Sequence, residues 1–323
     1  MPTPESYEFR KEHLELPVEL PDEELDEELS SALPYTGWIL VPLLVVAIVG
    51  VAVWIPYKTD EDESRRRVAP QAYLRPGTPA WIRHETGQQV ITDHSLKLLA
   101  GHDELDSIDL GDSQITDDGL EALVGLSRLN WVNLRNTRVT DAGLAHLAHL
   151  PRLRGLDLEG TQVTCHDLPE FPVLQSLTLT GSPVDDRGLK QLGRLTNLTD
   201  ISLQHTAVTD DGLVHLVSLK NLFVLSLSGT LVSSRGIARM DLRPKLRILH
   251  LNWTLVDDDA LVTLSSYPQL MELSLEGTQV SDRGVVQLVK LPYLMFLSLQ
   301  FAPVTPHGIR VLRGAHPDAI IMH

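Results

Sequence analysis

Hydrophobic and polar residues follow one another in this chain in a pattern that recurs at a nearly fixed spacing. Nine segments begin with a leucine that has further apolar residues three and five positions later. These leucines are Leu105, Leu129, Leu153, Leu174, Leu198, Leu222, Leu246, Leu270 and Leu294. Successive leucines are 24 residues apart, except for one gap of 21 residues. A period of this size predicts a solenoid of stacked repeats rather than a globular catalytic domain.

The repeat at residues 129–150 shows which elements the pattern predicts. Val132 and Leu134 are two residues apart, so they share one face of a β-strand. From Leu144 onward, leucines recur every three residues and share one face of a short helix. Thr140 stands where the N-cap of that helix is expected. Each repeat is therefore expected to be a strand, a turn and a short helix, and neighbouring strands are expected to form a parallel sheet.

A column of small residues follows the predicted strands. It consists of Ser113, Thr137, Thr161, Ser182, Thr206, Thr230, Thr254, Thr278 and Ala302. We expect the hydroxyls to form a hydrogen-bonded ladder that satisfies backbone groups of the loops inside the stack. Residues 81–104 are expected to be an N-terminal cap, and residues 319–321 a final short strand. Both ends must differ from the other repeats because one side of each meets water.

Written as L-x-x-L-x-L-x-x-T-x-V-T-D-x-G-L-x-x-L, the pattern covers residues 91–323 and resembles the leucine-rich repeat family. It is similar to the short form found in many bacterial proteins and in the repeat arms of F-box substrate adaptors. The resemblance implies an α/β fold, a curved solenoid with a parallel sheet on the concave side and short helices on the convex side. It implies no particular ligand. Residues 15–28 also resemble the start of an F-box.

One segment has the properties of a membrane span. Residues 38–57 carry no charged side chain. A helix of this length is about 30 Å long, which matches the hydrocarbon core of a bilayer. Tyr35, Trp38, Trp54 and Tyr57 flank the segment as an interfacial aromatic belt would. We therefore predict one transmembrane helix, in preference to a buried core helix or a cleaved signal peptide.

The distribution of charge distinguishes the residues before this segment from those after it. Residues 1–36 hold eleven Asp or Glu and two Lys or Arg, so this part supplies −9 of the net charge of −16. Residues 1–37 are therefore predicted to be a disordered acidic tail, and residues 58–80 a linker. The arginines at 65–67 follow the span, and the positive-inside rule then predicts cytoplasmic repeats. A periplasmic or extracellular repeat domain is the alternative.

The sequence offers little candidate chemistry. Cys165 is the single cysteine, which excludes an intramolecular disulfide and a cysteine-based zinc site. His146 and His149 lie on one predicted helix, but no H-E-x-x-H motif contains them. Neither a complete P-loop nor a G-x-S-x-G motif occurs, and the acidic repeats lack the basic stripe typical of nucleic-acid binding. We expect no catalytic residue, no cofactor, no metal and no nucleic-acid partner.

The predicted concave face of the sheet is the candidate binding surface. Its three columns of side chains come from the positions two, four and six residues after each repeat's first leucine. Apolar residues in the first column are predicted to face solvent, and exposed aromatic residues are enriched at binding hot spots. The partner-binding residues that we predict are Trp131, Asn133, Arg135, Val224, Ile248, His250, Asn252 and Phe296.

The repeat at 153–173 departs from the pattern. Pro169 and Pro172 remove backbone donors and oppose a regular helix. The three missing residues correspond to about one helical turn. We predict a loop or one short turn on the convex side, which is either tolerated decay of the repeat, a local change of curvature or a docking notch.

These features predict a single-pass membrane protein whose repeats bind a protein or peptide on the concave face. It would act as a scaffold, adaptor or receptor, without catalysis. A structural envelope protein, whose repeats self-associate or contact cell-wall material, is the second hypothesis. An adaptor in protein turnover, by analogy with F-box leucine-rich repeat proteins, is the third.

Overall fold

The computed structural model describes residues 91–99, 102–242 and 245–323, which belong to one compact unit. The predicted acidic tail, the predicted transmembrane helix at 38–57 and the predicted linker lie outside the described residues. Within the described part of the chain, no helix is both long and apolar enough to cross a bilayer.

The repeats form one parallel sheet of ten strands, which follow one another across the sheet in chain order. We number the repeats 1 to 9 from their first leucines, so each strand shares its number with its repeat. The strands are β1 (Ser107–Asp109), β2 (Trp131–Asn133), β3 (Gly155–Asp157), β4 (Ser176–Thr178), β5 (Asp200–Ser202), β6 (Val224–Ser226), β7 (Ile248–His250), β8 (Glu272–Ser274), β9 (Phe296–Ser298) and the final β10 (Ile320–Met322). The predicted solenoid and its parallel sheet are confirmed.

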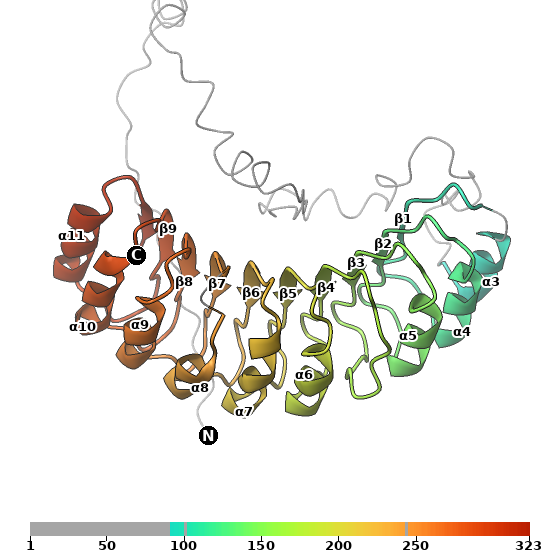
Figure 1. Ribbon diagram of the computed structural model, residues 1–323, viewed down its shortest axis with the longest axis horizontal. Coiled ribbons are helices and arrows are strands. Elements are labelled where there is room, and N and C mark those ends of the chain that lie inside the picture. Colours follow the sequence, from blue (N-terminus) through green and yellow to red (C-terminus); the bar gives the residue numbers. More distant parts are fainter. Residues whose placement is uncertain (1–90, 100–101, 243–244) are drawn as a thin grey trace, which may run out of the picture. The chain divides into compact units, whose positions relative to one another are not determined.

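Short helices lie on the outer, convex side of the arc, and the sheet lines the inner, concave side (Figure 1). The α-helices are α3 (Asp93–Leu96), α4 (Asp117–Leu120), α5 (Asp141–Leu147), α6 (Asp186–Leu192), α7 (Asp210–Leu213), α8 (Ser234–Arg239), α9 (Asp258–Leu264), α10 (Asp282–Val285) and α11 (Pro306–Ala315). The 3-10 helices are η1 (Lys97–Leu99), η2 (Glu121–Leu123), η3 (Val214–Ser218) and η4 (Val286–Lys290). Thr140 caps α5 as predicted, since its hydroxyl accepts the N–H of Ala142. Leu150 lies beyond the end of this helix but is buried all the same.

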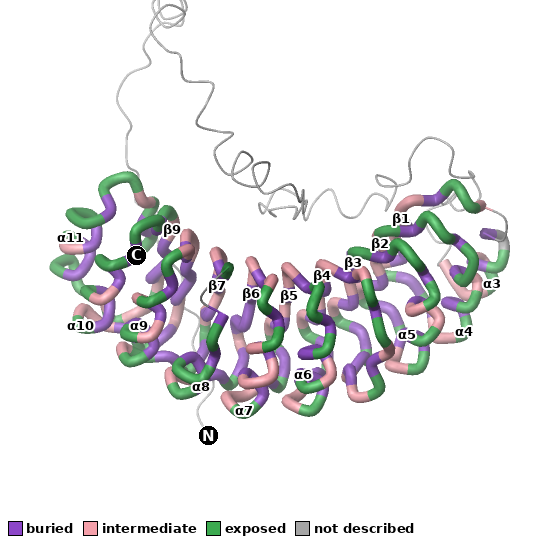
Figure 2. The backbone as a smooth tube through the Cα atoms, in the orientation of Figure 1, coloured by how far each residue is buried: buried purple, intermediate pink, exposed green. Residues whose placement is uncertain are grey.

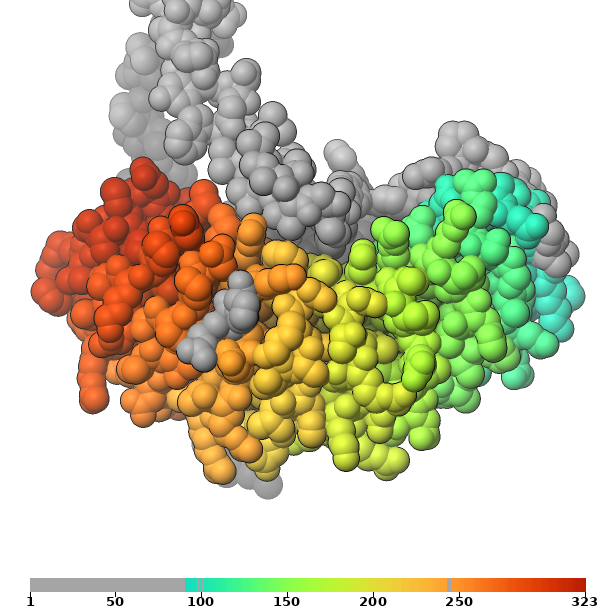
Figure 3. All heavy atoms as spheres, in the orientation of Figure 1, coloured from blue at the N-terminus to red at the C-terminus, as the bar shows by residue number. Residues whose placement is uncertain are grey.

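Leucine and valine side chains form the core between the sheet and the helices. Figure 2 shows buried residues in the successive repeats along the arc. In repeat 2, Val132 from β2, Leu134 directly after it, and Leu144 and Leu147 from α5 belong to this core and are fully buried. Each buried side chain of this size stabilises the fold by about 1.5–3 kcal/mol. The same positions are buried in the other repeats, so the core is continuous. The space-filling view shows successive repeats in contact along the arc (Figure 3).

The column of small hydroxyl residues satisfies backbone groups as predicted, but mostly within each repeat. The hydroxyl of Thr137 donates to the carbonyl of Leu134 at 2.6 Å, and its counterparts in other repeats do the same. The prediction that these hydroxyls satisfy backbone groups of the loops is therefore confirmed, and most of the bonds lie within one repeat. The reason is local, because a hydroxyl in a turn readily reaches the carbonyl three residues earlier. Ser182 differs, since it donates to Leu158 of the preceding repeat at 2.8 Å.

Hydrogen bonds between repeats come instead from the aspartate of the T-D-x-G motif. Asp117 accepts the backbone N–H of Thr140 at 2.8 Å and the hydroxyl of Thr140 at 2.6 Å. A Cβ on Gly143 would come 2.4 Å from the same carboxylate, so the glycine leaves room for it. The aspartates that make the same pair of bonds to the residue at the N-cap position of the next repeat are Asp93, Asp141, Asp186, Asp210, Asp258 and Asp282.

At the boundary between repeats 6 and 7 the hydroxyl and the carboxylate have exchanged places. Ser234 stands at the aspartate position, and Asp257 stands at the N-cap position. The Ser234 hydroxyl donates to Asp257 Oδ1 at 2.5 Å and accepts the Asp257 N–H at 3.0 Å. Because serine is shorter than aspartate, the glycine position of repeat 7 can hold a side chain, and Ala260 is found there.

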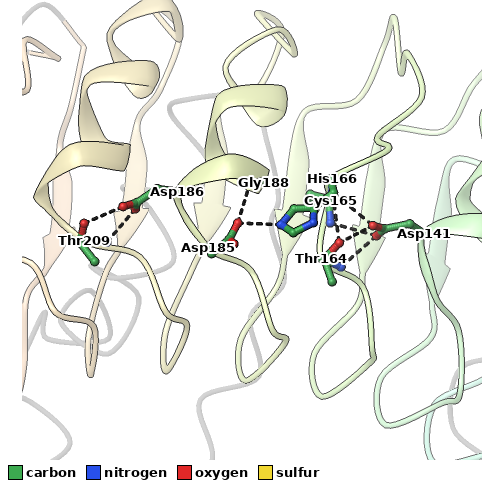
Figure 4. A network of polar contacts seen from close by, with 8 residues as sticks. All are labelled: Asp141, Thr164, Cys165, His166, Asp185, Asp186, Gly188 and Thr209. Carbon is green, nitrogen blue, oxygen red and sulfur yellow. Dashed lines mark hydrogen bonds and ion pairs between the residues drawn. The ribbon is translucent and has the colours of Figure 1, made fainter.

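A second exchange joins repeats 3 and 4 (Figure 4). Cys165 takes the aspartate position and Asp185 the N-cap position. His166 reaches across instead, with its Nε2 2.8 Å from Asp185 Oδ1. Asp185 also accepts the Gly188 N–H at 3.0 Å and so caps α6. Burial opposes the charge of Asp185, but the hydrogen bonds from Gly188 and His166 outweigh it and lower the pKa of this carboxyl.

Repeat 3 has a turn at residues 166–167 and, among the described residues, no helix where its neighbours have one. The prediction of a loop or short turn for this repeat is therefore confirmed. Asp141 holds the start of the loop, because it accepts the backbone N–H groups of Thr164, Cys165 and His166 at 2.8, 2.9 and 3.1 Å (Figure 4). Cys165 is buried there, and burial raises the pKa of its thiol.

Candidate protein-binding surface

The concave face carries the first and third side chains of each strand, while the second side chain enters the core. In the first column, Val224 lies opposite Ile248, and Glu272 lies between Ile248 and Phe296. The predicted register is confirmed along the sheet. The apolar residues of this column are half-buried rather than fully exposed. Side chains on neighbouring strands are about 4.8 Å apart, so they shield one another.

Trp131 lies against the next strand. A Cβ on Gly155 would come 1.9 Å from Trp131 Cε3, so the indole occupies the space that a side chain at 155 would need. Trp131 itself is half-buried. The lack of a side chain at Gly155 therefore makes room for the indole beside β3.

Two polar residues accompany Trp131 on β2 and the turn after it. The side-chain oxygen of Asn133 accepts the N–H of Arg135 at 2.9 Å. Arg135 Nε lies 3.6 Å from Glu159 Oε1, and these side chains are 28% and 36% exposed. Arg135 Nε is buried and has no hydrogen-bond partner among the described residues, so the guanidinium can form hydrogen bonds with another partner.

Asp157 lies beside this pair on β3. Burial raises the pKa of Asp157 to about 6, and the Glu159 carboxylate adds to the rise. The N–H of Glu159 and the charge of Arg135 act in the opposite direction. Asp200 on β5 also has a raised pKa because of burial, which the Thr199 hydroxyl partly offsets.

The remaining predicted residues lie on β6 to β9. His250 Nε2 is 2.9 Å from Glu272 Oε1. The side-chain oxygen of Asn252 accepts the N–H of Glu276 at 2.9 Å. These contacts cross from repeat 7 to repeat 8, so they fix the orientation of His250 and Asn252 on the face.

The eight predicted residues therefore form two groups rather than one site. Trp131, Asn133 and Arg135 belong to repeat 2. The second group consists of Val224, Ile248, His250, Asn252 and Phe296, from repeats 6, 7 and 9. Strands β3 to β5 separate the groups, and their outward side chains are small or acidic.

Two exposed aromatic residues escaped the sequence prediction. Trp253 and Phe301 follow the strands by three residues, in the turn beside the concave face, and are 57% and 77% exposed. Their ring centroids are 5.7 Å apart, with an interplanar angle of 33°. Both have left-handed backbones, with φ of 56° and 59°. The third predicted column lies one residue earlier in each repeat, so it did not include them.

A signal for this position was present in the sequence. The position seven residues after each first leucine holds Asp112, Asn136, Gly160, Gly181, His205, Gly229, Trp253, Gly277 and Phe301. All nine have positive φ. A column rich in glycine, asparagine and aspartate indicates a left-handed turn, and such turns lie at the surface. An aromatic residue in that column is therefore expected to be exposed.

Two family models, both described as leucine-rich repeat, match this chain. One covers residues 103–163 and the other residues 194–217. They agree with the parallel solenoid and its repeating core. The repeats of this chain at these positions are leucine-rich repeats.

Solved structures similar to this leucine-rich repeat protein include two internalins of Listeria monocytogenes. Internalin inlF has 21% identity and a TM-score of 0.53, over 70% of this chain and 69% of that chain. Internalin C2 has 24% identity and a TM-score of 0.50, over 68% of this chain and 87% of that chain. At these identities the likeness concerns the fold alone. The comparison with curated proteins finds no match.

The concave face of the leucine-rich repeats is acidic. The strands and the turns that follow them carry six carboxylates in the three columns, namely Asp109, Asp157, Glu159, Asp200, Glu272 and Glu276. Arg135 is the single Lys or Arg in these columns. The face therefore has a formal charge of −5, six negative charges and one positive, before the shifted pKa values are considered.

A hollow of about 220 Å³ lies beside the loop of repeat 3. Leu168, Pro169 and Phe171 line it from one side, and Arg194 and Leu195 from the next repeat. Glu170 and Arg194 form an ion pair at 3.1 Å at its edge, where both side chains are well exposed. This is where the sequence predicted a docking notch or a tolerated irregularity.

Proposed function

We propose that this leucine-rich repeat protein is a membrane-anchored scaffold, adaptor or receptor that binds a protein or peptide on its concave face, without catalysis. The observation that carries the proposal is the run of half-buried apolar side chains across β6, β7 and β9. Val224, Ile248 and Phe296 lie in one column of the sheet, where Val224 and Ile248 are adjacent and Glu272 separates Ile248 from Phe296.

The neighbouring column supports this assignment. Its members on β4 to β9, apart from His250, are small hydroxyl residues: Thr178, Ser202, Ser226, Ser274 and Ser298. Small side chains leave space for a partner's side chains beside the apolar column. Apolar anchors surrounded by smaller polar contacts are the usual arrangement of a binding hot spot.

Charge favours a basic partner. The face carries six carboxylates against one arginine, and rim charges of this kind accelerate association with an oppositely charged protein. A partner segment that presents lysine or arginine beside apolar residues fits both properties of the face.

Membrane anchoring rests on the sequence of residues 38–57. Its length, its lack of charge and its flanking aromatic residues support a single span. The basic residues that follow support cytoplasmic repeats, and labelling of each side of the membrane in intact cells tests that orientation.

The binding face can be tested by photo-crosslinking in cells. A benzophenone amino acid replaces Ile248 or Phe296 on the concave face, or Val262 on helix α9. Val262 is an exposed apolar residue of the convex side, so it controls for nonspecific contact. We expect the same partner proteins to crosslink to positions 248 and 296, and we expect none of these proteins to crosslink to position 262. Crosslinks from 262 alone would place binding on the convex side.

Self-association is a second candidate function, and the last strand favours it. β10 ends the sheet, and Ile320 and Met322 on it are 63% and 39% exposed. An open strand edge with exposed apolar residues can pair with another copy. Sedimentation of the full-length protein over a range of concentrations tests this function. Ile320→Lys would then abolish a dimer that the wild type forms.

A further inference from the structure

The turns at the edge of the concave face in repeats 6, 7 and 9 carry an unusual set of side chains. Leu231 and Leu255 occupy the same position of repeats 6 and 7, and they are 59% and 53% exposed. Trp253 and Phe301 lie in the same turns of repeats 7 and 9. We call these four residues the aromatic rim.

The backbone is strained at Trp253 and Phe301, the two aromatic residues of the rim. A left-handed φ is unfavourable for a bulky side chain, and other repeats place Gly, Asn, Asp or His at this position. Strained residues persist where a site makes use of them. Replacement by glycine would remove the strain, yet Trp253 and Phe301 keep large rings there.

Gly277 lets the two rings meet. It occupies the same turn in repeat 8, between Trp253 and Phe301, and a Cβ on it would come 2.3 Å from Trp253 Cε3. The indole therefore lies over the backbone of Gly277 and reaches the ring of Phe301, 5.7 Å away between centroids. The rings of repeats 7 and 9 thus form one continuous aromatic surface.

The charges around this surface are of one sign. The strands and turns at 224–231, 248–255, 272–279 and 296–303 contain Glu272 and Glu276 and no lysine or arginine. Glu276 directly precedes Gly277. One of its oxygens accepts the Ser298 hydroxyl at 2.6 Å, which orients the carboxylate toward repeat 9.

We propose that the aromatic rim binds an arginine-bearing, extended segment of a partner protein. The guanidinium lies on the rings of Trp253 and Phe301, Glu276 supplies the counter-charge, and an aliphatic neighbour of the arginine packs on Leu231 and Leu255. A planar guanidinium stacks on aromatic rings better than an ammonium and is less strongly hydrated, which favours arginine over lysine. The same chemistry occurs within this chain, where Arg247 lies 5.4 Å from the ring centroid of Phe223.

The inference rests on the proposed function in that both concern a protein partner. The two can nevertheless fail separately. Crosslinking from Ile248 and Phe296 tests the concave face, whereas the experiment below tests the rim with defined peptides.

The test is fluorine NMR of the full-length protein labelled with 5-fluorotryptophan. Trp253→Phe assigns the Trp253 signal by removing it, and the Trp131 signal serves as the internal control. The probes are the peptides acetyl-GLRLRG-amide, acetyl-GLKLKG-amide and acetyl-GLELEG-amide. We expect the arginine peptide to shift the Trp253 signal and leave that of Trp131 in place. Binding should be about 5-fold weaker for the lysine peptide and undetectable for the glutamate peptide.

Two variants complete the test. Phe301→Gly removes one ring and relieves its left-handed strain, so it should fold with unchanged or raised thermal stability and yet bind the arginine peptide at least about 5-fold more weakly. Glu276→Gln should weaken binding several-fold and reduce its salt dependence. The proposal is overturned if the Trp253 signal does not respond to the arginine peptide, or responds equally to the glutamate peptide. A shift with protein concentration alone would also overturn it, because the occupant would then be a second copy.

Discussion

The carboxylate of Asp117 accepts both the backbone N–H and the hydroxyl of Thr140, at 2.8 and 2.6 Å, across the boundary between repeats 1 and 2. The contact joins the first turn of one helix to the N-cap of the next. It therefore couples the repeats through the same residues that start each helix.

Asp117→Ala should destabilise the repeats by about 1–3 kcal/mol, because it leaves the Thr140 N–H without its charged acceptor. Denaturant unfolding followed by circular dichroism measures the change. Asp118→Ala is the matched control, since Asp118 is an exposed acidic residue in the same first turn. We expect the control to stay within about 0.5 kcal/mol of the wild type. Equal losses for both variants would mean that the helix dipole, rather than the contact between repeats, accounts for the effect.

The exchanged pair of repeats 6 and 7 predicts a mutational rescue. Ser234→Asp alone should destabilise by about 1–3 kcal/mol, because it brings a second carboxylate against Asp257 and crowds Ala260. Adding Asp257→Thr and Ala260→Gly rebuilds the arrangement found at other boundaries and should restore most of the loss. Unfolding midpoints of the single and triple variants measure this coupling. If the losses of stability from the separate substitutions simply add up in the triple variant, residues 234 and 257 do not interact as the structure indicates.

Gly181 and Gly277 occupy the same position of their repeats. Comparing alanine substitutions at the two positions distinguishes the cost of a left-handed backbone from the cost of a steric clash. Gly181 and Gly277 have φ of 67° and 63°, but a Cβ on Gly181 meets nothing within 4 Å, whereas one on Gly277 meets the Trp253 ring at 2.3 Å. Gly181→Ala should cost about 1–2 kcal/mol from the left-handed backbone alone. Gly277→Ala should cost about 1 kcal/mol more and should displace the indole. Thermal unfolding measures the first effect and the fluorine signal of Trp253 the second.

Asp157 predicts a pH dependence of stability. Its pKa of about 6 in the folded chain exceeds the ordinary value of 3.8, so the native state holds a proton that the unfolded state releases between these values. The stability contributed by this group is complete below about pH 4 and is lost as the pH rises through about 6. Asp157→Asn should therefore be more stable than the wild type at pH 7, by about 1–3 kcal/mol, and similar at pH 4. An advantage that is the same at both pH values would show that the charge is not its cause.

Much of this fold could be predicted from the repeat alone, because position in the repeat decides burial. The alternation of Val132 and Leu134 predicted the strands and their register, and Thr140 predicted a helix start. The prolines of repeat 3 correctly indicated a loop. These predictions depend on local periodicity, which the sequence displays directly.

Contacts between repeats could not be predicted in the same way. The hydroxyl column was expected to satisfy backbone groups of the loops, as Thr137 does within its own turn. The sequence did not show that Asp117 connects one repeat to the next. Trp253 and Phe301 were missed because their exposure follows from a left-handed turn and their contact skips a repeat. The predicted residues at Trp131 and at Ile248 are confirmed on the concave face, but whether they bind a partner stays a prediction.

The exchanged pairs also limit how the array can gain or lose repeats in evolution. Deleting repeat 6 alone would set the carboxylate of Asp210 against that of Asp257, and the new junction would repel. Deleting repeats 4, 5 and 6 together would instead bring His166 to Asp257, a histidine to a carboxylate, as already occurs at Asp185. The chain can thus be shortened or lengthened without conflict only in blocks whose ends match, for example repeat 5 alone, which would set Asp186 against Ser233, or repeats 4 to 6 together.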